Sequence, residues 1–230
     1  MLALTPFAVS PALGHGDVAP QPVDTAALPD VGEDWLDENP YRVEAVGEDV
    51  WAKAVEIGAS GYNQNCARCH GLEGVSGGLA PDLRYLEANW DGDEWYVERF
   101  VNGYTQNGIT KMPAFGELLG QKAAWAIRTY VETRPDDGAL DPYADQLKAI
   151  RDDLKAKSGE LAGGADYAAM AAAVDGYRTA LAEISAQVET GSGAPIADSA
   201  ASRAAAALDG SADSVHSAAE VLTIGLSAAE

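Results

Sequence analysis

Five consecutive residues, Cys66-Ala67-Arg68-Cys69-His70, combine two thiols and an imidazole at a spacing that suits one chemical task. Two cysteines separated by two residues can add to the two vinyl groups of one porphyrin, and the histidine that follows reaches one face of the iron. The motif therefore predicts one covalently bound haem c, attached at Cys66 and Cys69, with His70 as an iron ligand. The chain has no further cysteine.

A Cys-x-x-Cys pair also occurs in redox dithiols and in zinc sites. Thioredoxin-like dithiols lie within a βαβ pattern, and a zinc site needs two further ligands at short spacing. Neither pattern surrounds Cys66 and Cys69 in the sequence, so the haem interpretation is preferred.

The iron needs a second axial ligand, and Met112 is the candidate. It stands in Lys-Met-Pro-Ala-Phe, where Pro113 prevents a continuing helix and keeps Met112 extended. A thioether stabilises ferrous iron, which raises the reduction potential and suits an electron carrier. The alternative is a methionine that only packs in the core. Met170 and His216 lie far along the chain and are expected to be core or surface residues.

Three helices and no strand are expected around this site. Caps and apolar residues at helical spacing place them from Asp49 to about Gly61, from Asp91 to a stop at Gly103, and from Glu117 to Glu132. Glycine-rich loops are expected at 71–78 and 102–108.

Residues 137–230 predict a second domain, an antiparallel helical bundle. Apolar residues recur at steps of three and four over 140–161 and 167–188, and a third helical stretch, broken or kinked near Gly210, runs over 198–226. Three helices are the simplest arrangement, and the expected fold class is all-α. The bundle carries no constellation of ligating residues, so an inert spacer and a docking module both remain open.

The formal net charge of -21 excludes nucleic acid and an anionic membrane surface as partners, because both require a basic face. Steering toward a basic docking patch and adaptation for solubility or high salt both remain open. The acidic segment 30–38 could dock a basic partner or wrap the domain as a solvated arm.

Residues 1–13 carry no charge and are too short to span a bilayer, as in the apolar part of a signal peptide. The usual basic segment is missing, so either the true start lies upstream or this is a flexible apolar end. The first interpretation is preferred, with cleavage between Ala12 and Gly14, and it predicts export to the periplasm. His15 would then lie at a frayed end, or could coordinate a metal. No other segment has 18 uninterrupted apolar residues, so no membrane insertion is expected.

Residues 48–134 resemble a class I cytochrome c. Gly58 and Tyr62 lie eight and four residues before Cys66, where that family crosses its first and last helices, and Tyr130 matches the aromatic partner from the last helix. The resemblance implies that the Pro81 carbonyl fixes the Nδ1 proton of the proximal histidine. It also suggests Arg84 as a haem propionate partner, with a surface ion pair as the alternative.

A narrower resemblance covers residues 15–134. The stretches His15-Gly16-Asp17-Val18, Glu33-Asp34-Trp35-Leu36, Asn39-Pro40-Tyr41-Arg42 and Tyr62-Asn63-Gln64-Asn65 resemble the periplasmic cytochrome c that serves PQQ-dependent alcohol dehydrogenases. This implies a carrier that takes single electrons from a PQQ-dependent alcohol dehydrogenase and passes them to a terminal oxidase or another cytochrome. The chain departs from that subgroup after residue 135. The expected organisation is a signal-peptide remnant (1–14), an acidic arm (15–47), a haem domain (48–136) and the bundle (137–230).

An electron carrier is the preferred function. A peroxidase would need an open iron position and a nearby acid or base, and a haem-based redox or gas sensor would need Met112 to leave the iron. Because Met112 supplies the second ligand and nothing supplies catalysis, the carrier is preferred. Family analogy places its docking surface around Ala67, Arg68 and residues 112–115.

Overall fold

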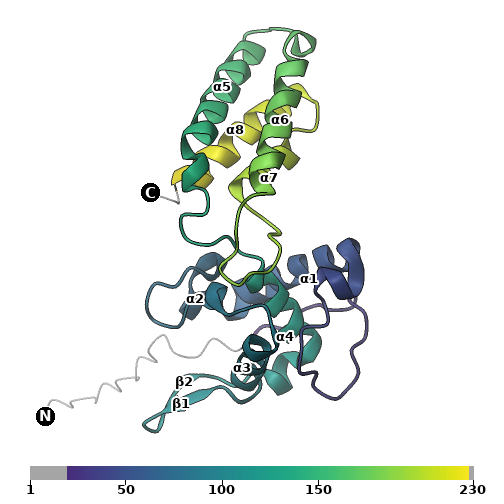
Figure 1. The fold of residues 1–230 in the computed structure, drawn as a ribbon, viewed down its shortest axis with the longest axis vertical. Coiled ribbons are helices and arrows are strands. Elements are labelled where there is room, and N and C mark those ends of the chain that lie inside the picture. Colours follow the sequence, from purple (N-terminus) through teal and green to yellow (C-terminus); the bar gives the residue numbers. More distant parts are fainter. Residues whose placement is uncertain (1–19, 228–230) are drawn as a thin grey trace, which may run out of the picture.

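The computed structural model describes residues 20–227, and its regular elements are helices apart from one short hairpin (Figure 1). The N-terminal unit, residues 20–136, contains α1 (Val43–Asn65), α2 (Ala67–His70), α3 (Trp90–Asn102), β1 (Tyr104–Gln106), β2 (Ile109–Met112) and α4 (Gly116–Glu132). The C-terminal unit, residues 137–227, contains α5 (Ala144–Ala162), α6 (Ala171–Ser185), α7 (Ala200–Ala207) and α8 (Ala212–Ser227). Single 3-10 turns lie at Leu72–Gly74, Leu83–Tyr85, Asp141–Tyr143 and Tyr167–Ala169. The predicted all-α class is confirmed. Within residues 20–227, no helix combines the length and the apolar character needed to span a bilayer.

The crossing of α1 and α4 organises the N-terminal unit. A Cβ atom added to Gly58 would lie 1.9 Å from the carbonyl oxygen of Ala126, so the two backbones touch where glycine stands. One turn further along α1, the rings of Tyr62 and Tyr130 lie with centroids 5.3 Å apart. The predicted crossing is confirmed, and it places the end of α1, and with it Cys66, over the buried face of α4.

Two helices begin earlier than predicted. The α1 helix begins at Val43 instead of Asp49, because Gly47 adopts a φ of 75° and lets a short first turn join the main helix. The α3 helix is capped by Asn89 instead of Asp91. The side-chain oxygen of Asn89 accepts a hydrogen bond from Gly92 N at 3.0 Å. Its predicted stop at Gly103 is confirmed.

The expectation that the N-terminal unit has no strand was wrong. Strands β1 and β2 form an antiparallel hairpin whose turn residues, Asn107 and Gly108, have φ values of 51° and 74°. Two positive φ angles in an Asn-Gly pair suit a two-residue hairpin turn. Because nearly every residue of the two strands is exposed, the alternating apolar pattern of a half-buried strand is absent. Met112 therefore ends a strand, rather than lying in a plain loop.

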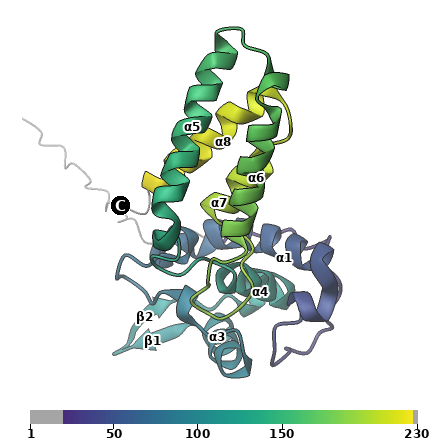
Figure 2. The ribbon, with the colours of Figure 1, turned by 45° about the horizontal axis from the view of Figure 1, so that its top comes forward.

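The C-terminal unit has its own buried cluster and contains four helices, because the third predicted stretch is broken near Gly210, one of the two forms expected for it. Gly210, with a φ of 90°, separates α7 from α8 completely. Helix α8 packs on α5 and α7, and α6 packs on α7, which gives the elongated layer above the N-terminal unit in Figure 2. The buried residues of this cluster are apolar: Leu147, Ile150, Leu154, Met170, Val174, Leu181, Ile184, Ala201, Ala204, Leu208, Val215, Ala218, Ala219, Leu222 and Leu226. None of them belongs to the cluster of the N-terminal unit.

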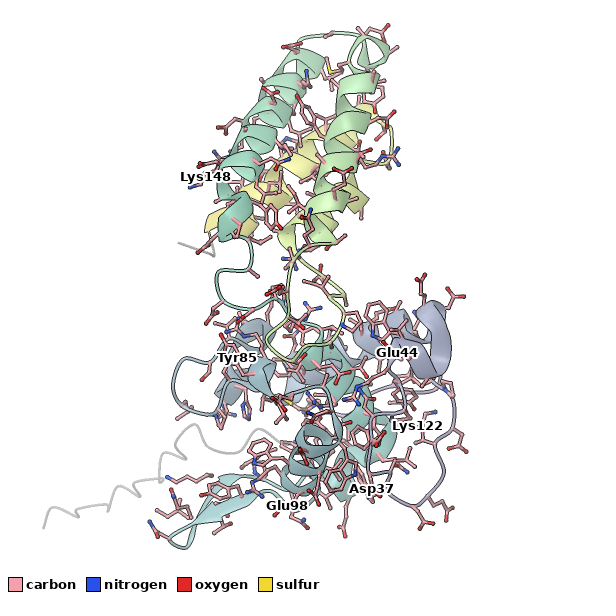
Figure 3. The ribbon with its side chains drawn as sticks, viewed as in Figure 1. Asp37, Glu44, Tyr85, Glu98, Lys122 and Lys148 are labelled. Atoms are coloured by element: carbon pink, nitrogen blue, oxygen red, sulfur yellow. The ribbon has the colours of Figure 1, made fainter. Side chains whose placement is uncertain are left out.

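The described part of the acidic arm wraps the N-terminal unit. Gln121 on α4 donates from Nε2 to the carbonyl oxygens of Gly32 and Asp34, each at 2.8 Å. Lys122 Nζ donates to Leu28 O, also at 2.8 Å. These bonds hold the backbone of the arm, while its acidic side chains at 30, 33, 34, 37 and 38 stay exposed; Figure 3 labels Asp37 among them.

A buried network of four charges ties the arm to α3 and α4. Asp93 accepts from Arg42 at 2.8 Å and from Arg128 at 2.9 Å, and Glu132 accepts from Arg42 at 2.9 Å. Asp93, Arg128 and Glu132 are at most 1% exposed. Two positive and two negative side chains cancel, which makes burial of the group tolerable. Nothing in the sequence pattern had indicated this network.

Candidate haem site

A single helical turn brings the three motif residues together. Helix α1 ends at Asn65, and Cys66 O then accepts backbone hydrogen bonds from Cys69 N at 3.1 Å and His70 N at 3.0 Å. This turn, α2, presents two thiols and one imidazole from a five-residue segment. Cys66 is half-buried, Cys69 is exposed and His70 is buried.

The Cys66 thiol does not have the character of a reactive thiol in a redox dithiol. Burial, followed by the neighbouring Cys69, raises the pKa of Cys66 to about 12. Reactive dithiols depend instead on a lowered thiolate pKa. The zinc alternative has no support either, because residues 20–227 contain no group of three or more His, Cys, Asp or Glu side chains placed to hold a metal ion.

His70 is held with one ring nitrogen committed to the protein. Its Nδ1 lies 2.8 Å from the carbonyl oxygen of Pro81. A carbonyl oxygen can only accept, so Nδ1 carries the proton and Nε2 keeps its lone pair. The ring is therefore prepared to bind a metal through Nε2, and the contact with Pro81 is the one that the resemblance to class I cytochromes implies.

Gly71 and Tyr62 shape the turn that follows His70, and the sequence had not assigned them this role. Gly71 has a φ of 83°, and an added Cβ would lie 1.8 Å from Val75 O. Tyr62 OH donates to Gly71 O at 2.8 Å. The aromatic residue at the helix crossing thus also fixes the chain after the motif.

The partners of the Arg84 side chain are groups of the protein itself, two carboxylates and one carbonyl oxygen. Its side chain is 4% exposed and pairs with Asp82 at 2.7 Å and with Asp137 at 2.8 Å, and Nη1 donates to Pro135 O at 3.2 Å. Burial opposes its charge, but the hydrogen bonds and ion pairs with both carboxylates outweigh burial and raise the pKa of Arg84. The ion pair offered as the alternative is present, but its arginine side chain is buried instead of lying at the surface. A propionate contact of Arg84 stays a prediction.

The backbone around Met112 packs closely against Gly103, the residue that ends α3. An added Cβ on Gly103, whose φ is 68°, would lie 2.5 Å from Met112 O and 2.8 Å from Ala114 N. Just beyond, Phe115 N donates to Phe100 O at 2.8 Å. Met112 is half-buried and packs on the same apolar cluster as Cys66 and Ala67. The fold thus brings the methionine and the start of the motif to one cluster, from positions 46 residues apart.

The other candidate ligands lie elsewhere. Met170 is buried in the core of the C-terminal unit, and His216 is exposed on α8 with Nδ1 3.4 Å from Ser158 Oγ, as expected for core and surface residues. His15 lies outside the described residues.

The donor set fits a covalent haem. Two thiols lie three positions apart in one helical turn, an imidazole offers Nε2, and a thioether packs on the same apolar cluster as the first thiol. Apolar surroundings suit the porphyrin ring.

Comparison with known proteins points to the same kind of protein. The family model described as cytochrome c oxidase, cbb3-type, subunit III matches residues 53–131. Cytochrome c550 of Pseudomonas aeruginosa is 55% identical over 122 residues, which cover 53% of this chain and 82% of that protein. No solved structure matches the chain.

Two longer proteins match over part of their length. Quinohemoprotein alcohol dehydrogenase ADH IIB of Pseudomonas putida is 33% identical over 99 residues, 41% of this chain and 14% of the dehydrogenase. The cbb3-type cytochrome c oxidase subunit FixPc of Rhizobium leguminosarum bv. viciae is 31% identical over 121 residues, 46% of this chain and 42% of the subunit. This chain therefore spans a small part of the dehydrogenase and under half of the oxidase subunit.

Proposed function

The chain belongs to the class I c-type cytochromes, and from this membership we propose that it accepts single electrons from a PQQ-dependent alcohol dehydrogenase in the periplasm and passes them to a terminal oxidase or another cytochrome. The electron-carrier role follows from the family. The identity of 55% with a cytochrome c550 is the observation that carries the electron-carrier part of the proposal. The similarity to a quinohemoprotein alcohol dehydrogenase supports the donor, and the similarity to a cbb3-type oxidase subunit supports the acceptor.

The protein holds a covalent haem c, and we propose that Cys66 and Cys69 form its two thioether bonds while His70 and Met112 ligate the iron. The bound haem supplies a one-electron ferric/ferrous couple. The chain orients the imidazole through the Pro81 carbonyl and presents Met112 at the end of β2, before Pro113. A thioether ligand stabilises the reduced state, so the chain is suited to accept electrons from a strong donor.

A docking surface next to the motif is supported by exposure. Arg68 and Cys69 are exposed, and on the other side of the site Pro113 and Ala114 are exposed as well. The loop after His70 exposes Leu72 at 73%. Exposed apolar atoms beside the thioethers would let a partner approach closely, with little water left between the two proteins.

We further propose that residues 48–136 form the haem domain, preceded by the arm (15–47) and followed by a helical domain (137–230). Two buried clusters without a common residue support the division. So does the match of 122 residues to a cytochrome c550, a length close to that of the arm and the haem domain together.

The first test is spectroscopic and then kinetic. Ferric protein with a His/Met-ligated iron should show the weak band near the red edge of the visible spectrum, and the ferrous form should resist carbon monoxide. Rapid mixing with an alcohol-reduced quinoprotein dehydrogenase should then reduce the haem within a single turnover. Rapid carbon monoxide binding by the ferrous protein would favour a sensor or peroxidase instead. A firm His/Met spectrum without reduction would contradict only the choice of donor.

A further inference from the structure

The C-terminal unit contacts two segments of the N-terminal unit that lie next to His70 in the structure. The first is the loop 71–75, where Arg203 of α7 lies 3.5 Å from Glu73. The second is the segment 81–88, which begins with the carbonyl that accepts from His70. The α6–α7 connection, residues 186–199, descends from the C-terminal unit onto the N-terminal unit in Figure 1 and reaches this second segment.

Backbone hydrogen bonds fix the α6–α7 connection in register. Ala88 N donates to Ser192 O at 2.9 Å, which ties the connection directly to the segment 81–88. On the other side, Asp136 N donates to Glu189 O at 3.0 Å, and Ser192 Oγ donates to Glu132 O. Bonds between main-chain atoms that are not neighbours in sequence hold position more rigidly than exposed ion pairs do. The connection is therefore a fixed support.

A side chain at the centre of this contact would displace its neighbours. A Cβ added to Gly191 would lie 2.8 Å from Cδ1 of Tyr85 and 3.1 Å from Arg84 O. Figure 3 shows Tyr85 at the junction of the two units. The Tyr85 hydroxyl donates to Asp137 at 2.9 Å. The connection thus presses on residues three and four positions after Pro81.

Hydrogen bonds of Asp82 link the residues that contact Gly191 to Pro81. Asp82, next to Pro81, accepts from Arg84 N and Arg84 Nε, each at 3.0 Å. It also accepts from Ser76 N at 3.3 Å, in the loop that follows His70. A displacement of Arg84 therefore moves Asp82, and with it the peptide that carries the Pro81 carbonyl.

We propose that the C-terminal unit holds the Pro81 carbonyl against His70, so that Gly191 and Ser192 are positioning residues for the proximal iron ligand. The inference rests on the proposed function, because it requires His70 to ligate the iron. A carbonyl that accepts from Nδ1–H raises the basicity of the imidazole, which favours ferric iron. The supported protein should accordingly have a lower reduction potential than one whose connection is loosened.

The test compares two glycine substitutions in the full-length, haem-loaded protein. Gly191→Ala places a methyl group against Tyr85, whereas Gly176→Ala, on α6 of the same unit, meets nothing within 4 Å. Two quantities are measured: the midpoint potential, and the hydrogen exchange rate of the Ala88 amide, which reports whether the connection stays in place. Gly191→Ala should raise the potential and speed exchange at Ala88, and Gly176→Ala should do neither.

Two outcomes would overturn the proposal. Faster exchange at Ala88 with an unchanged potential would mean that the connection does not act on His70. Unchanged exchange together with an unchanged potential would mean that the connection does not press on the segment at all. If Gly191→Ala fails to fold, Ser192→Ala removes the hydroxyl that donates to Glu132 O and accepts from Ala194 N, with exposed Ser217→Ala on α8 as its control. It should raise the potential by a smaller amount, and a potential equal to that of the control would overturn the proposal.

The wild-type spectrum separates this proposal from the proposed function. If the wild-type protein lacks the His/Met signature, the ligand assignment fails first. If the signature is present and the variants leave the potential unchanged, only the role of the C-terminal unit fails.

Discussion

Arg128 Nε donates to Asp93 Oδ1 at 2.9 Å, and both side chains are completely buried. Asp93 also accepts from Asn39 N at 2.8 Å and from Arg42, so one carboxylate joins α3, α4 and the arm. Burial of a carboxylate carries a desolvation free energy. The hydrogen bonds and ion pairs from the surrounding donors offset this free energy only while all of the donors are present. The arm and the haem unit should therefore lose stability together.

Asp93→Asn should destabilise the protein by about 3 kcal/mol, because it leaves the two arginines with one carboxylate. The free energy of unfolding is measured by denaturant titration of the ferric protein. Asp91→Asn changes an exposed carboxylate on the same helix and serves as the control. Equal stability of the two variants would show that Asp93 contributes nothing through its charge.

Met112→Ala should lower the midpoint potential by on the order of 0.1 V or more, since axial ligands set haem potentials over a range of about 0.8 V. The ferrous protein should then bind carbon monoxide. Met170→Leu, which removes the methionine of the C-terminal core, should change neither property. A six-coordinate, carbon-monoxide-resistant Met112→Ala protein would contradict the ligand assignment.

Gly58→Val should cost about 3 kcal/mol or more, because even a Cβ atom would overlap the Ala126 carbonyl where α1 crosses α4. The yield of haem-loaded protein and its thermal midpoint both report the loss. Gly159→Val places the same side chain at an exposed position of α5, where an added Cβ meets nothing within 4 Å. A normal yield and midpoint for Gly58→Val would mean that the two helices cross elsewhere.

Stability should depend on acid pH through Asp82. Burial by itself would raise the pKa of the Asp82 carboxyl, but hydrogen bonds from Arg84 and from Ser76 N lower it below its ordinary value of 3.8. A carboxyl with a lowered folded-state pKa contributes stability above its unfolded pKa and loses it as the pH falls through the folded value.

Wild-type protein should therefore exceed Asp82→Asn in stability by about 1–2 kcal/mol at pH 7, and the gap should close on acidification. Denaturant titrations of both proteins at pH 7 and at about pH 3 measure the gap. Asp91→Asn should show no such convergence. A constant gap at both pH values would mean that Asp82 keeps an ordinary pKa.

The turn that carries the motif and the helix crossing before it were predictable because both depend on residues close together in sequence. The motif needs five adjacent residues, and the helix crossing needs Gly58 and Tyr62 one turn apart on a helix that ends at Asn65, just before Cys66. Such short spacings survive folding unchanged. The same reasoning found α4 to within one residue, since apolar periodicity dominates a helix that is buried on most sides.

The missed features depend on tertiary contacts or on the absence of burial. The hairpin of β1 and β2 is exposed, so only the Asn107-Gly108 pair could have indicated it. Asp93 and Arg128 look like ordinary surface charges in the sequence, and they are buried by tertiary contacts with the arm and with residues 86–87. The contact of Gly191 with Tyr85 joins residues 106 positions apart, and no periodicity predicts such a meeting.

The cancellation inside the buried network has a consequence for encounters between two copies of the protein. Since Arg42, Asp93, Arg128 and Glu132 sum to zero, the formal charge of -21 is carried entirely by the remaining residues. Two such molecules repel each other at low ionic strength. Electron self-exchange between copies should be slow there and should accelerate with added salt, so that in dilute salt the electron leaves only to a partner of different charge.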